Sequence, residues 1–348
     1  MKDNKIKILK SFQDIDFSSL KLRRNFEINS LNYLIDSGYI NLDTPVIESA
    51  DLFFRKSLGS TSGNTYTFTD PQNQQVSLRP DFTASIMRYV FSNSGKIEND
   101  VGKYCYSGPV FRFENDDKSY NQLYQIGAEY ISKKKHGYES EVIFDAVKCL
   151  QINNVKEFKI NLGNVGIIRK YLDKLGLNNS LIEFFLTNLK LFNIKNYEEE
   201  LLSKAKFQNL IKNSKKTENL SKDEIKEKFN IELQSNLGLR SHDEVVDRYF
   251  NKLSNQVIES EFNESIIKLK ELLNIKIENI NRNSFETELN FEDFKKLINS
   301  LLESGIQKNN ICIDFSLTRN LAYYDGVVFD LIYKNELIGG GGKYDDLP

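Results

Sequence analysis

The clearest alternation of apolar and polar positions lies between Tyr104 and Ile131. Phe111 and Phe113 share one side of an extended chain, and Val110, Arg112 and Glu114 share the other. A polar stretch, 115–121, precedes a second alternating run. Two such runs joined by a short polar loop predict an antiparallel hairpin. The second strand has one face suited to a core, formed by Tyr124, Ile126, Ala128 and Tyr130. Its other face is more polar and is formed by Leu123, Gln125, Gly127, Glu129 and Ile131.

Other segments of the first 162 residues show helical or strand periodicity of their own. Residues 17–38 predict an amphipathic helix, with Ile28, Leu31 and Ile35 at helical spacing and Gly38 placed to end it. A further helix carries Ile86, Met87 and Val90. The remaining predictions are strands at Thr44–Glu48, Thr65–Thr69, Gln75–Leu78 and Phe158–Leu162, a turn at Asp70–Asn73, and a helix over 138–150.

From there to about residue 303 helical patterns rich in Lys, Glu and Asn dominate, with capping boxes at Ser221 and Ser241. The segment Lys212–Lys228 reads as a solvated, charged helix and linker. Strand patterns then return at Ile311–Phe315, Val327–Tyr333 and Leu337–Ile338, the last running into Gly339–Gly342. The order of elements predicts an α+β fold, an antiparallel sheet flanked by helices with a helical insertion before its last strands.

Composition excludes several classes of function. The 348 residues carry 47 basic and 49 acidic side chains, so there is no global electrostatic footprint for nucleic acid, although a local basic patch stays open. Three distant cysteines and two isolated histidines predict neither a disulfide framework, a metal site nor histidine-based nucleophilic catalysis, and no cofactor is expected. Without an apolar signal core or a membrane-length apolar run, we expect a cytoplasmic protein that does not enter a membrane.

Two groups of polar residues are candidates for a binding site. Arg112, Gln125 and Glu129 meet around Gly127, and their opposite charges would match a zwitterion. The alternative is a solvated sheet face with an ordinary surface ion pair. Asp81 and Thr83 follow a strand, where they would either cap the next helix or help to line the same site. The run Gly339–Gly342 would bring backbone close to a ligand or form a flexible turn, but no GK[ST] follows for a P-loop.

These pieces resemble one known family in the right order. TFTDPQNQQVSLRPDFT resembles the segment leading into LRPEGT of histidyl-tRNA synthetases, and FRFE with QLYQIGAE resembles class II synthetase motif 2. LTRNLAYYDGVVFD and GGGGKYDDL resemble the family's LVRGLDYYTGTVFE and GGGRYDGL. The resemblance covers roughly residues 5–150 and 310–348. It implies a synthetase-like core over 1–150, a mostly helical insertion over 151–305 and a return to the core sheet over 306–348, with motif 3 and the anticodon-binding domain absent.

Carried over residue by residue, the resemblance implies a pocket for free histidine. Glu129 and Gln125 would hold the amino group, with Asp81 and Thr83 beside them. Tyr323 and Tyr324 would bound the imidazole side, and Tyr344 would come from the glycine-rich turn. Arg112 and Arg319 stand where the synthetase uses arginines on the reacting carboxylate and phosphate. Asp81 is one methylene shorter than the family's glutamate, which would shift the amino-group contact.

The departures from the family point away from adenylation. The motif 2 loop of the synthetase is rich in arginine, whereas residues 115–121 contain two aspartates, one lysine and no arginine. Aspartates there would repel a triphosphate, and phosphoryl chemistry depends on charge stabilisation. The segment Leu237–Ser241 with Glu244 and Arg248 is similar to the regulatory subunit of ATP phosphoribosyltransferase, a synthetase paralogue. This implies a regulatory, non-catalytic chain of histidine biosynthesis.

That resemblance also implies partners. The chain would form a homodimer through its motif 1-like helix and a hetero-octamer with the short-form ATP phosphoribosyltransferase catalytic subunit. Histidine would be the allosteric effector, and tRNA would not be bound. One alternative is a diverged or truncated histidyl-tRNA synthetase. Another is a partner that has lost histidine binding and activates by assembly alone, which Asp81, Asn320 and Ala322 keep open.

Overall fold

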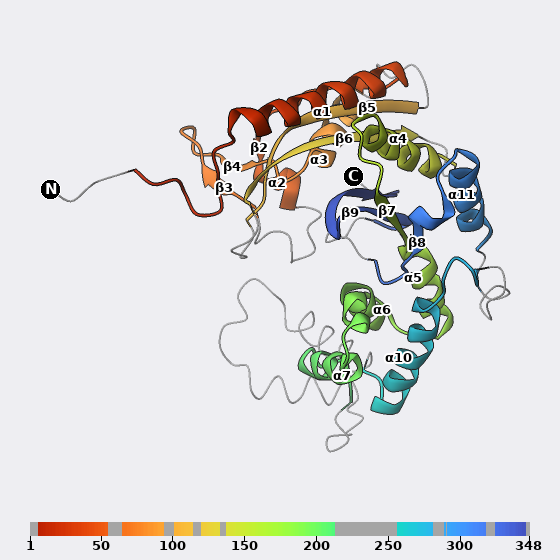
Figure 1. Ribbon diagram of the computed structural model, residues 1–348. Helices are drawn as coiled ribbons and strands as arrows, with labels where there is room; N and C mark the ends of the chain where they lie inside the picture. Colours follow the sequence, from red (N-terminus) through yellow and green to blue (C-terminus); the bar gives the residue numbers. More distant parts are fainter. Residues whose placement is uncertain are drawn as a thin grey trace, which may run out of the picture. The chain divides into compact units, whose positions relative to one another are not determined.

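The computed structural model describes a defined part of the chain, to which every statement below refers. The described residues are 6–54, 65–93, 101–113, 120–132, 137–212, 256–280, 289, 291–317 and 324–345. They form two compact units (Figure 1). Unit 1 is drawn from 1–160, 292–311 and 319–348, and unit 2 from 161–291 and 312–318.

The first helix of unit 1, α1 (Phe17–Asp36), starts and ends where the sequence predicts. The Asp16 carboxylate accepts the backbone N–H of Ser19 at 2.7 Å, and Gly38 takes a φ of +88° just beyond the end. The prediction that Ile28, Leu31 and Ile35 form the buried face of this helix is only partly correct. Leu34 and Ser30 are buried, whereas Ile28 and Ile35 are 55% and 45% exposed. The helix therefore packs through a neighbouring stripe and leaves an apolar one uncovered in the isolated chain.

The predicted hairpin is confirmed as β5 (Val101–Phe111) and β6 (Gln122–Ser132), paired antiparallel over their whole length. A short strand, β1 (Ile40–Asn41), pairs with β5 in parallel, so the sheet is not purely antiparallel. The alternation of β5 sorts its side chains between two cores. Tyr104 and Tyr106 pack with Phe82 and with buried residues of α3 (Thr83–Ser92), which follows it, while Cys105 packs with Leu34. Both faces of the hairpin are covered by helices, since α1 and α4 (Glu139–Ile152) contact it as well (Figure 1).

A second small sheet holds the approach to α3. Its order is β2 (Ile47–Ser49), β4 (Gln75–Leu78) and β3 (Thr67–Thr69), all antiparallel, and α2 (Ala50–Phe54) follows β2. The predicted turn between β3 and β4 is confirmed, because the Asp70 carboxylate accepts the backbone N–H groups of Gln72 and Gln74. Strand β4 delivers the chain directly to Asp81 and the start of α3.

The third sheet has the order β10 (Glu336–Gly342), β9 (Val327–Tyr333), β7 (Phe158–Asn164) and β8 (Ile311–Ile313). Strands β9 and β10 form a hairpin whose two turn residues, Lys334 and Asn335, both have positive φ, as in a type I′ turn. The interpretation of the four glycines as a flexible turn is wrong, because they pair with β9 from Leu331 to Val328. Helix α11 (Glu292–Glu303) and the turn η4 (Lys308–Asn310) precede β8, and α11 contacts α4 within unit 1.

Unit 2 is mainly helical, as the sequence predicts for this part of the chain. Its described helices are α5 (Val165–Lys174), α6 (Asn179–Asn188), η3 (Leu189–Asn193), α7 (Tyr197–Phe207) and α10 (Glu259–Leu273). Phe184, Phe185, Phe192 and Phe262 form its aromatic core. Both predicted capping boxes and the Leu237–Ser241 segment lie outside the described residues. The α+β class is confirmed, and the three domain ranges stay a prediction.

Candidate functional site

A cavity of about 470 Å³ in unit 1 gathers most of the residues singled out from the sequence. Strand β6 contributes Gln125 and Glu129, the end of β5 leads into Arg112, and the start of α3 contributes Asp81 and Thr83. Tyr324 and Tyr344 line it from either end of the β9–β10 hairpin. Arg319 and Tyr323 lie outside the described residues. Seven of the nine predicted residues thus border one cavity, whose size suits a small molecule.

Glu129 is the most constrained polar group in this cavity. Its Oε1 accepts the Thr83 hydroxyl at 2.7 Å and the Tyr106 hydroxyl at 3.3 Å, and its Oε2 accepts the Tyr344 hydroxyl at 2.6 Å. The side chain is 8% exposed, so the interpretation of this strand face as a solvated surface is wrong. Hydroxyls from three separate elements hold the carboxylate in one orientation, as a preorganised binding group requires.

Asp81 combines a structural and an electrostatic role. Its carboxylate accepts the backbone N–H groups of Thr83 and Ala84, so Asp81 caps the first turn of α3. Phe82, the residue directly before the helix, makes no side-chain capping hydrogen bond. Arg79 fixes the loop that carries it. The Arg79 Nη1 donates to the Thr44 carbonyl at 2.5 Å, and its Nε donates to the Pro109 carbonyl at 2.9 Å. The predicted alternatives for Asp81, cap or cavity residue, are both realised in one side chain.

The buried Glu129 and the half-buried Asp81 share the cavity with one guanidinium of the described residues, that of Arg112. Burial raises the pKa of Glu129, against the hydrogen bonds of Tyr344 and Thr83, which lower it. Burial also raises the pKa of Asp81, and the positive charge of Arg112 opposes that rise. The Arg112 Nε donates to the Pro80 carbonyl at 2.8 Å, which anchors the guanidinium beside Asp81. The arrangement offers strong acceptors for a ligand ammonium and one cation for a ligand carboxylate.

Gln125 adds an acceptor that the described protein does not use. Its Oε1 is buried and has no hydrogen-bond partner among the described residues. Leaving such an oxygen unpaired costs about 1–3 kcal/mol. Because Gln125 lines the cavity, a donor on a ligand would relieve this cost. The observation supports the grouping of Gln125 with Glu129 that the sequence predicts.

Sequence reasoning missed Tyr106 and misread Gly127. These residues face each other across the hairpin, and a Cβ on Gly127 would lie 2.5 Å from the Tyr106 hydroxyl oxygen. Gly127 therefore leaves no gap. It accommodates the ring of Tyr106, which stacks on Phe82 at 4.3 Å and donates to Glu129. An aromatic residue opposite a glycine was the available signal, but it requires the register that the folded hairpin provides.

The glycine-rich strand has a similar function at the other wall. A Cβ on Gly342 would lie 2.6 Å from Cδ1 of Tyr324, so glycine lets this ring pack against the strand. Beyond the strand, the Asp345 N–H donates to Asp325 Oδ2 at 2.8 Å, and the Lys343 N–H donates to the Val327 carbonyl at 2.7 Å. These bonds hold Tyr344 where its hydroxyl reaches Glu129. The glycines serve close side-chain packing.

Other kinds of site find no support in the described part of the chain. It contains no group of three or more His, Cys, Asp or Glu side chains arranged to hold a metal ion. None of the described helices has both the length and the apolar character needed to cross a bilayer.

Comparison with known proteins places this architecture. A family model described as histidyl-tRNA synthetase matches residues 11–235. The chain belongs to the histidyl-tRNA synthetase family. Among curated relatives, the histidine–tRNA ligase of Sulfurisphaera tokodaii is 27% identical over 315 residues, covering 89% of this chain and 62% of the relative. That of Methanococcus vannielii is 26% identical over 338 residues, covering 94% and 67%. The chain thus spans about two thirds of the length of these relatives.

Solved structures agree on the fold. A Bacillus halodurans protein described as an ATP phosphoribosyltransferase regulatory subunit/histidyl-tRNA synthetase matches with a TM-score of 0.63 and 20% identity, over 99% of this chain and 77% of that one. A histidine–tRNA ligase subunit from Alicyclobacillus acidocaldarius matches with a TM-score of 0.60 and 21% identity, over 98% and 90%. The fold is that of a histidyl-tRNA synthetase-like class II synthetase.

Proposed function

We propose that the chain is a non-catalytic, histidine-binding regulatory subunit that acts with the short-form catalytic subunit of ATP phosphoribosyltransferase. One observation carries the proposal. Among the described residues, the cavity around Glu129 places the carboxylates of Glu129 and Asp81 and a buried amide oxygen without a partner against one guanidinium, that of Arg112. That charge pattern matches a free amino acid, with its ammonium at Glu129, Asp81 and Gln125 and its carboxylate near Arg112.

The neighbouring sequence supports binding without adenylation. A nucleoside triphosphate needs several cations close to its phosphates, because catalysis of phosphoryl transfer rests on charge stabilisation. Residues 115–121, which follow Arg112 in the chain, contain Asp116 and Asp117 against one lysine. Among the described residues, those lining the cavity carry four carboxylates besides Glu129 and two cations, Arg112 and Lys343. This composition favours an amino acid over a triphosphate.

Regulation requires that the ligand distinguish two states of the partner. A chain that binds histidine without consuming it can shift a catalytic subunit between states if histidine binds those states unequally. The description of the Bacillus halodurans neighbour, which includes an ATP phosphoribosyltransferase regulatory subunit, supports this choice of partner.

The test combines the chain with a short-form ATP phosphoribosyltransferase catalytic subunit and follows phosphoribosyl-ATP formation with and without histidine. We expect activation that histidine suppresses. The variant Glu129→Gln should retain activation and lose the response to histidine, since it removes the ligand-binding charge and preserves the side-chain shape. Absence of activation with a matched catalytic subunit contradicts the proposal.

A second candidate is a diverged histidyl-tRNA ligase. The curated relatives named above are all histidine–tRNA ligases, and Arg319 stands in the sequence where the synthetase signature has an arginine. This candidate predicts histidine-dependent exchange of pyrophosphate with ATP, which the regulatory proposal excludes. A third outcome, activation of the catalytic subunit with no effect of histidine, would assign the chain a purely structural role in assembly.

A homodimer is part of the proposal. Phe17, Ile28 and Ile35 lie on one stripe of α1 and are 81%, 55% and 45% exposed. An uncovered apolar stripe on a long helix is typical of an interface. We expect Ile28→Asp with Ile35→Asp to convert a dimer to a monomer in sedimentation experiments, while the control Lys170→Asp, at an exposed position of α5, leaves the dimer intact.

A further inference from the structure

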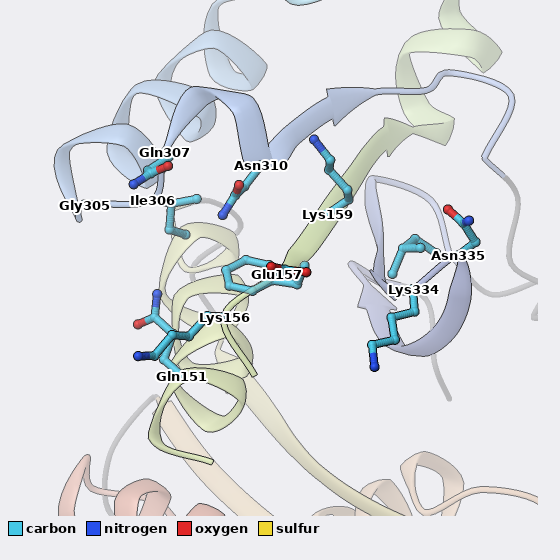
Figure 2. Close-up of a pocket in the computed structure, with 12 residues that line it drawn as sticks. Gln151, Lys156, Glu157, Lys159, Gly305, Ile306, Gln307, Asn310, Lys334 and Asn335 are labelled. Atoms are coloured by element: carbon cyan, nitrogen blue, oxygen red, sulfur yellow. The ribbon is translucent and has the colours of Figure 1, made fainter. Parts of the chain in front are cut away.

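A second cavity in unit 1, of about 730 Å³, lies apart from the residues that surround Glu129. Figure 2 shows its walls. They are formed by the end of α4, the start of β7, the segment that follows α11, and the turn between β9 and β10. None of its lining residues borders the Glu129 cavity. Its chemistry therefore calls for an explanation separate from histidine binding.

The rim of this cavity carries unbalanced positive charge. Lys156, Lys159 and Lys334 line it, against the single carboxylate of Glu157. In the described part of the chain no carboxylate lies within ion-pair distance of these lysines, and the Lys159 ammonium donates instead to the Asn309 carbonyl at 2.7 Å. Lys103 and Lys343 of the same unit each pair with a glutamate. The cavity rim is thus left with charge available to a partner.

One of these lysines occupies a backbone position that disfavours it. Lys334 has a φ of +50° at the first position of the type I′ turn, where Asn, Asp or Gly is strongly preferred. A long side chain in this left-handed region costs about 1 kcal/mol. The turn requires this φ, and lysine stands there despite its cost, with its ammonium 5.1 Å from the centre of the Tyr333 ring.

The directions of the lysine side chains indicate the kind of ligand. In Figure 2 the three labelled lysines extend in different directions, Lys156 and Lys159 from the start of β7 or just before it and Lys334 from the β9–β10 turn, with Glu157 between them. They do not converge on one point, as binding of a single phosphate would require. Separated cations suit an extended ligand with several separated negative charges. The carboxamides of Gln151, Gln307 and Asn310 also line the cavity and can pair with peptide N–H and C=O groups.

The apolar and aromatic residues that line the cavity favour a peptide over a nucleic acid as its ligand. The lining includes Ile332, which is half-buried and offers apolar surface for a side chain, whereas Ile306 and Phe158 are each 4% exposed. Phe158 is the single aromatic residue of the lining, and at 4% exposure it cannot stack on a base. From this combination we propose that the cavity is a docking site for an acidic peptide segment of a partner protein.

The test measures fluorescence anisotropy of a labelled peptide built from Glu-Gly-Leu repeats, using the full chain. A peptide with Lys in place of Glu, and an oligothymidylate of equal negative charge, serve as comparison ligands. We expect the acidic peptide to bind, more weakly at higher salt, and the basic peptide not to bind. Stronger binding of the oligothymidylate, or no binding of the acidic peptide, overturns the proposal.

Matched variants locate the site. Lys156→Gln should weaken acidic-peptide binding about two- to fivefold, and Glu157→Gln should strengthen it by a similar factor, because each changes one exposed charge at the rim. The control Lys170→Gln removes an exposed lysine of α5 and should have no effect. If Lys156→Gln and Lys170→Gln change affinity equally, binding is non-specific attraction to the surface and the proposal fails.

The variant Lys334→Asn should change thermal stability and peptide binding in opposite directions. Because Asn tolerates positive φ, this variant should raise the Tm by about 1–3 °C. It should also weaken peptide binding about two- to fivefold, since it removes a charge from the rim. A variant that becomes more stable and binds as well as before would show that Lys334 has no role in docking.

Discussion

Each face of the β5–β6 hairpin buries one carboxylate, and the two carboxylates have different surroundings. Glu129 is 8% exposed and faces α3, while Asp145 of α4 is 5% exposed and lies against the opposite face. The Asp145 Oδ1 accepts the Tyr33 hydroxyl at 2.7 Å, and its Oδ2 accepts the Tyr39 hydroxyl at 2.8 Å. Although Asp145 also borders the Glu129 cavity, both of its oxygens have protein partners.

The two carboxylates differ in whether the polar groups around them have partners within the protein. Beside Asp145, Lys103 pairs with Glu141 and lies 5.0 Å from the centre of the Tyr130 ring, so opposite charges are matched within the protein. Beside Glu129 a second carboxylate, Asp81, and the Gln125 oxygen, which has no partner among the described residues, add negative character that Arg112 alone does not balance. Buried polar groups that are fully paired stabilise a fold, and those that are incompletely paired indicate a binding site.

The largest expected effect is loss of ligand affinity in Glu129→Gln. Removing the charge should weaken histidine binding about 100-fold, because a buried ammonium loses its charged partner. The free energy of unfolding should stay unchanged or rise, since a desolvated charge is removed. Isothermal calorimetry and thermal unfolding measure the two quantities. Unchanged affinity would show that the Glu129 carboxylate does not bind the ligand.

Asp145→Ala should show the opposite pattern. It leaves two tyrosine hydroxyls without their acceptor, so we expect about 2–3 kcal/mol lower stability. Histidine affinity should remain within about threefold. Asp145→Asn retains an acceptor oxygen and should lose less stability. Urea unfolding and calorimetry test the pair. A loss of affinity as large as that of Glu129→Gln would remove the distinction between the two faces.

Gly127→Ala tests the packing that supports Glu129. The new Cβ would lie 2.5 Å from the Tyr106 hydroxyl oxygen, so the ring must move. We expect about 1–3 kcal/mol lower stability and weaker histidine binding. Gly339→Ala is the matched control, because its Cβ would lie 3.7 Å from Leu331 Cδ1, an ordinary contact. Equal effects of the two alanines on stability and affinity would contradict the role assigned to Gly127.

The pH dependence should separate binding from stability. Burial raises the pKa of Glu129 and of Asp81, so both take up protons at a higher pH when folded than when unfolded. As the pH falls from 7 towards the ordinary carboxyl range, histidine affinity should fall, because protonation removes the acceptors of its ammonium. Over the same range these groups should add stability, since the folded state binds more protons than the unfolded state.

Calorimetry at several pH values measures the affinity, and proton release on binding gives an independent reading. In Glu129→Gln the slope of affinity with pH should be reduced. A slope equal to that of the wild type would assign the titration to other groups.

The smallest effect concerns the thiols. Burial raises the pKa of Cys105 to about 11 and that of Cys149 to about 12, whereas Cys312 is exposed. At pH 8 we therefore expect iodoacetamide to modify Cys312 first, because the thiolate is the reactive form. Peptide mass spectrometry of the native protein gives the order. Early modification of Cys149 would indicate that the α4 side of the hairpin opens readily.

Local sequence patterns determined most of the elements. Alternation placed the hairpin, Gly38 ended α1, and Asp70 marked the turn between β3 and β4, because each signal acts over a few neighbouring residues. The resemblance of four short segments to synthetase motifs named nine residues for one pocket, and seven of them line one cavity in the structure. Binding of histidine by these residues stays a prediction.

The tertiary structure decided which polar groups are satisfied. The role of Tyr106 depends on the register that sets it opposite Gly127, and the packing role of the glycine strand depends on where Tyr324 and Phe329 lie. The stripe of α1 that packs inward could not be read from periodicity, because two adjacent stripes of the helix are apolar. The sequence pattern singles out Glu129 and gives no role to Asp145, although both carboxylates are buried. The hydroxyl groups that donate to these carboxylates come from distant parts of the chain. Only the folded structure brings Thr83 and Tyr344 to Glu129, and Tyr33 and Tyr39 to Asp145.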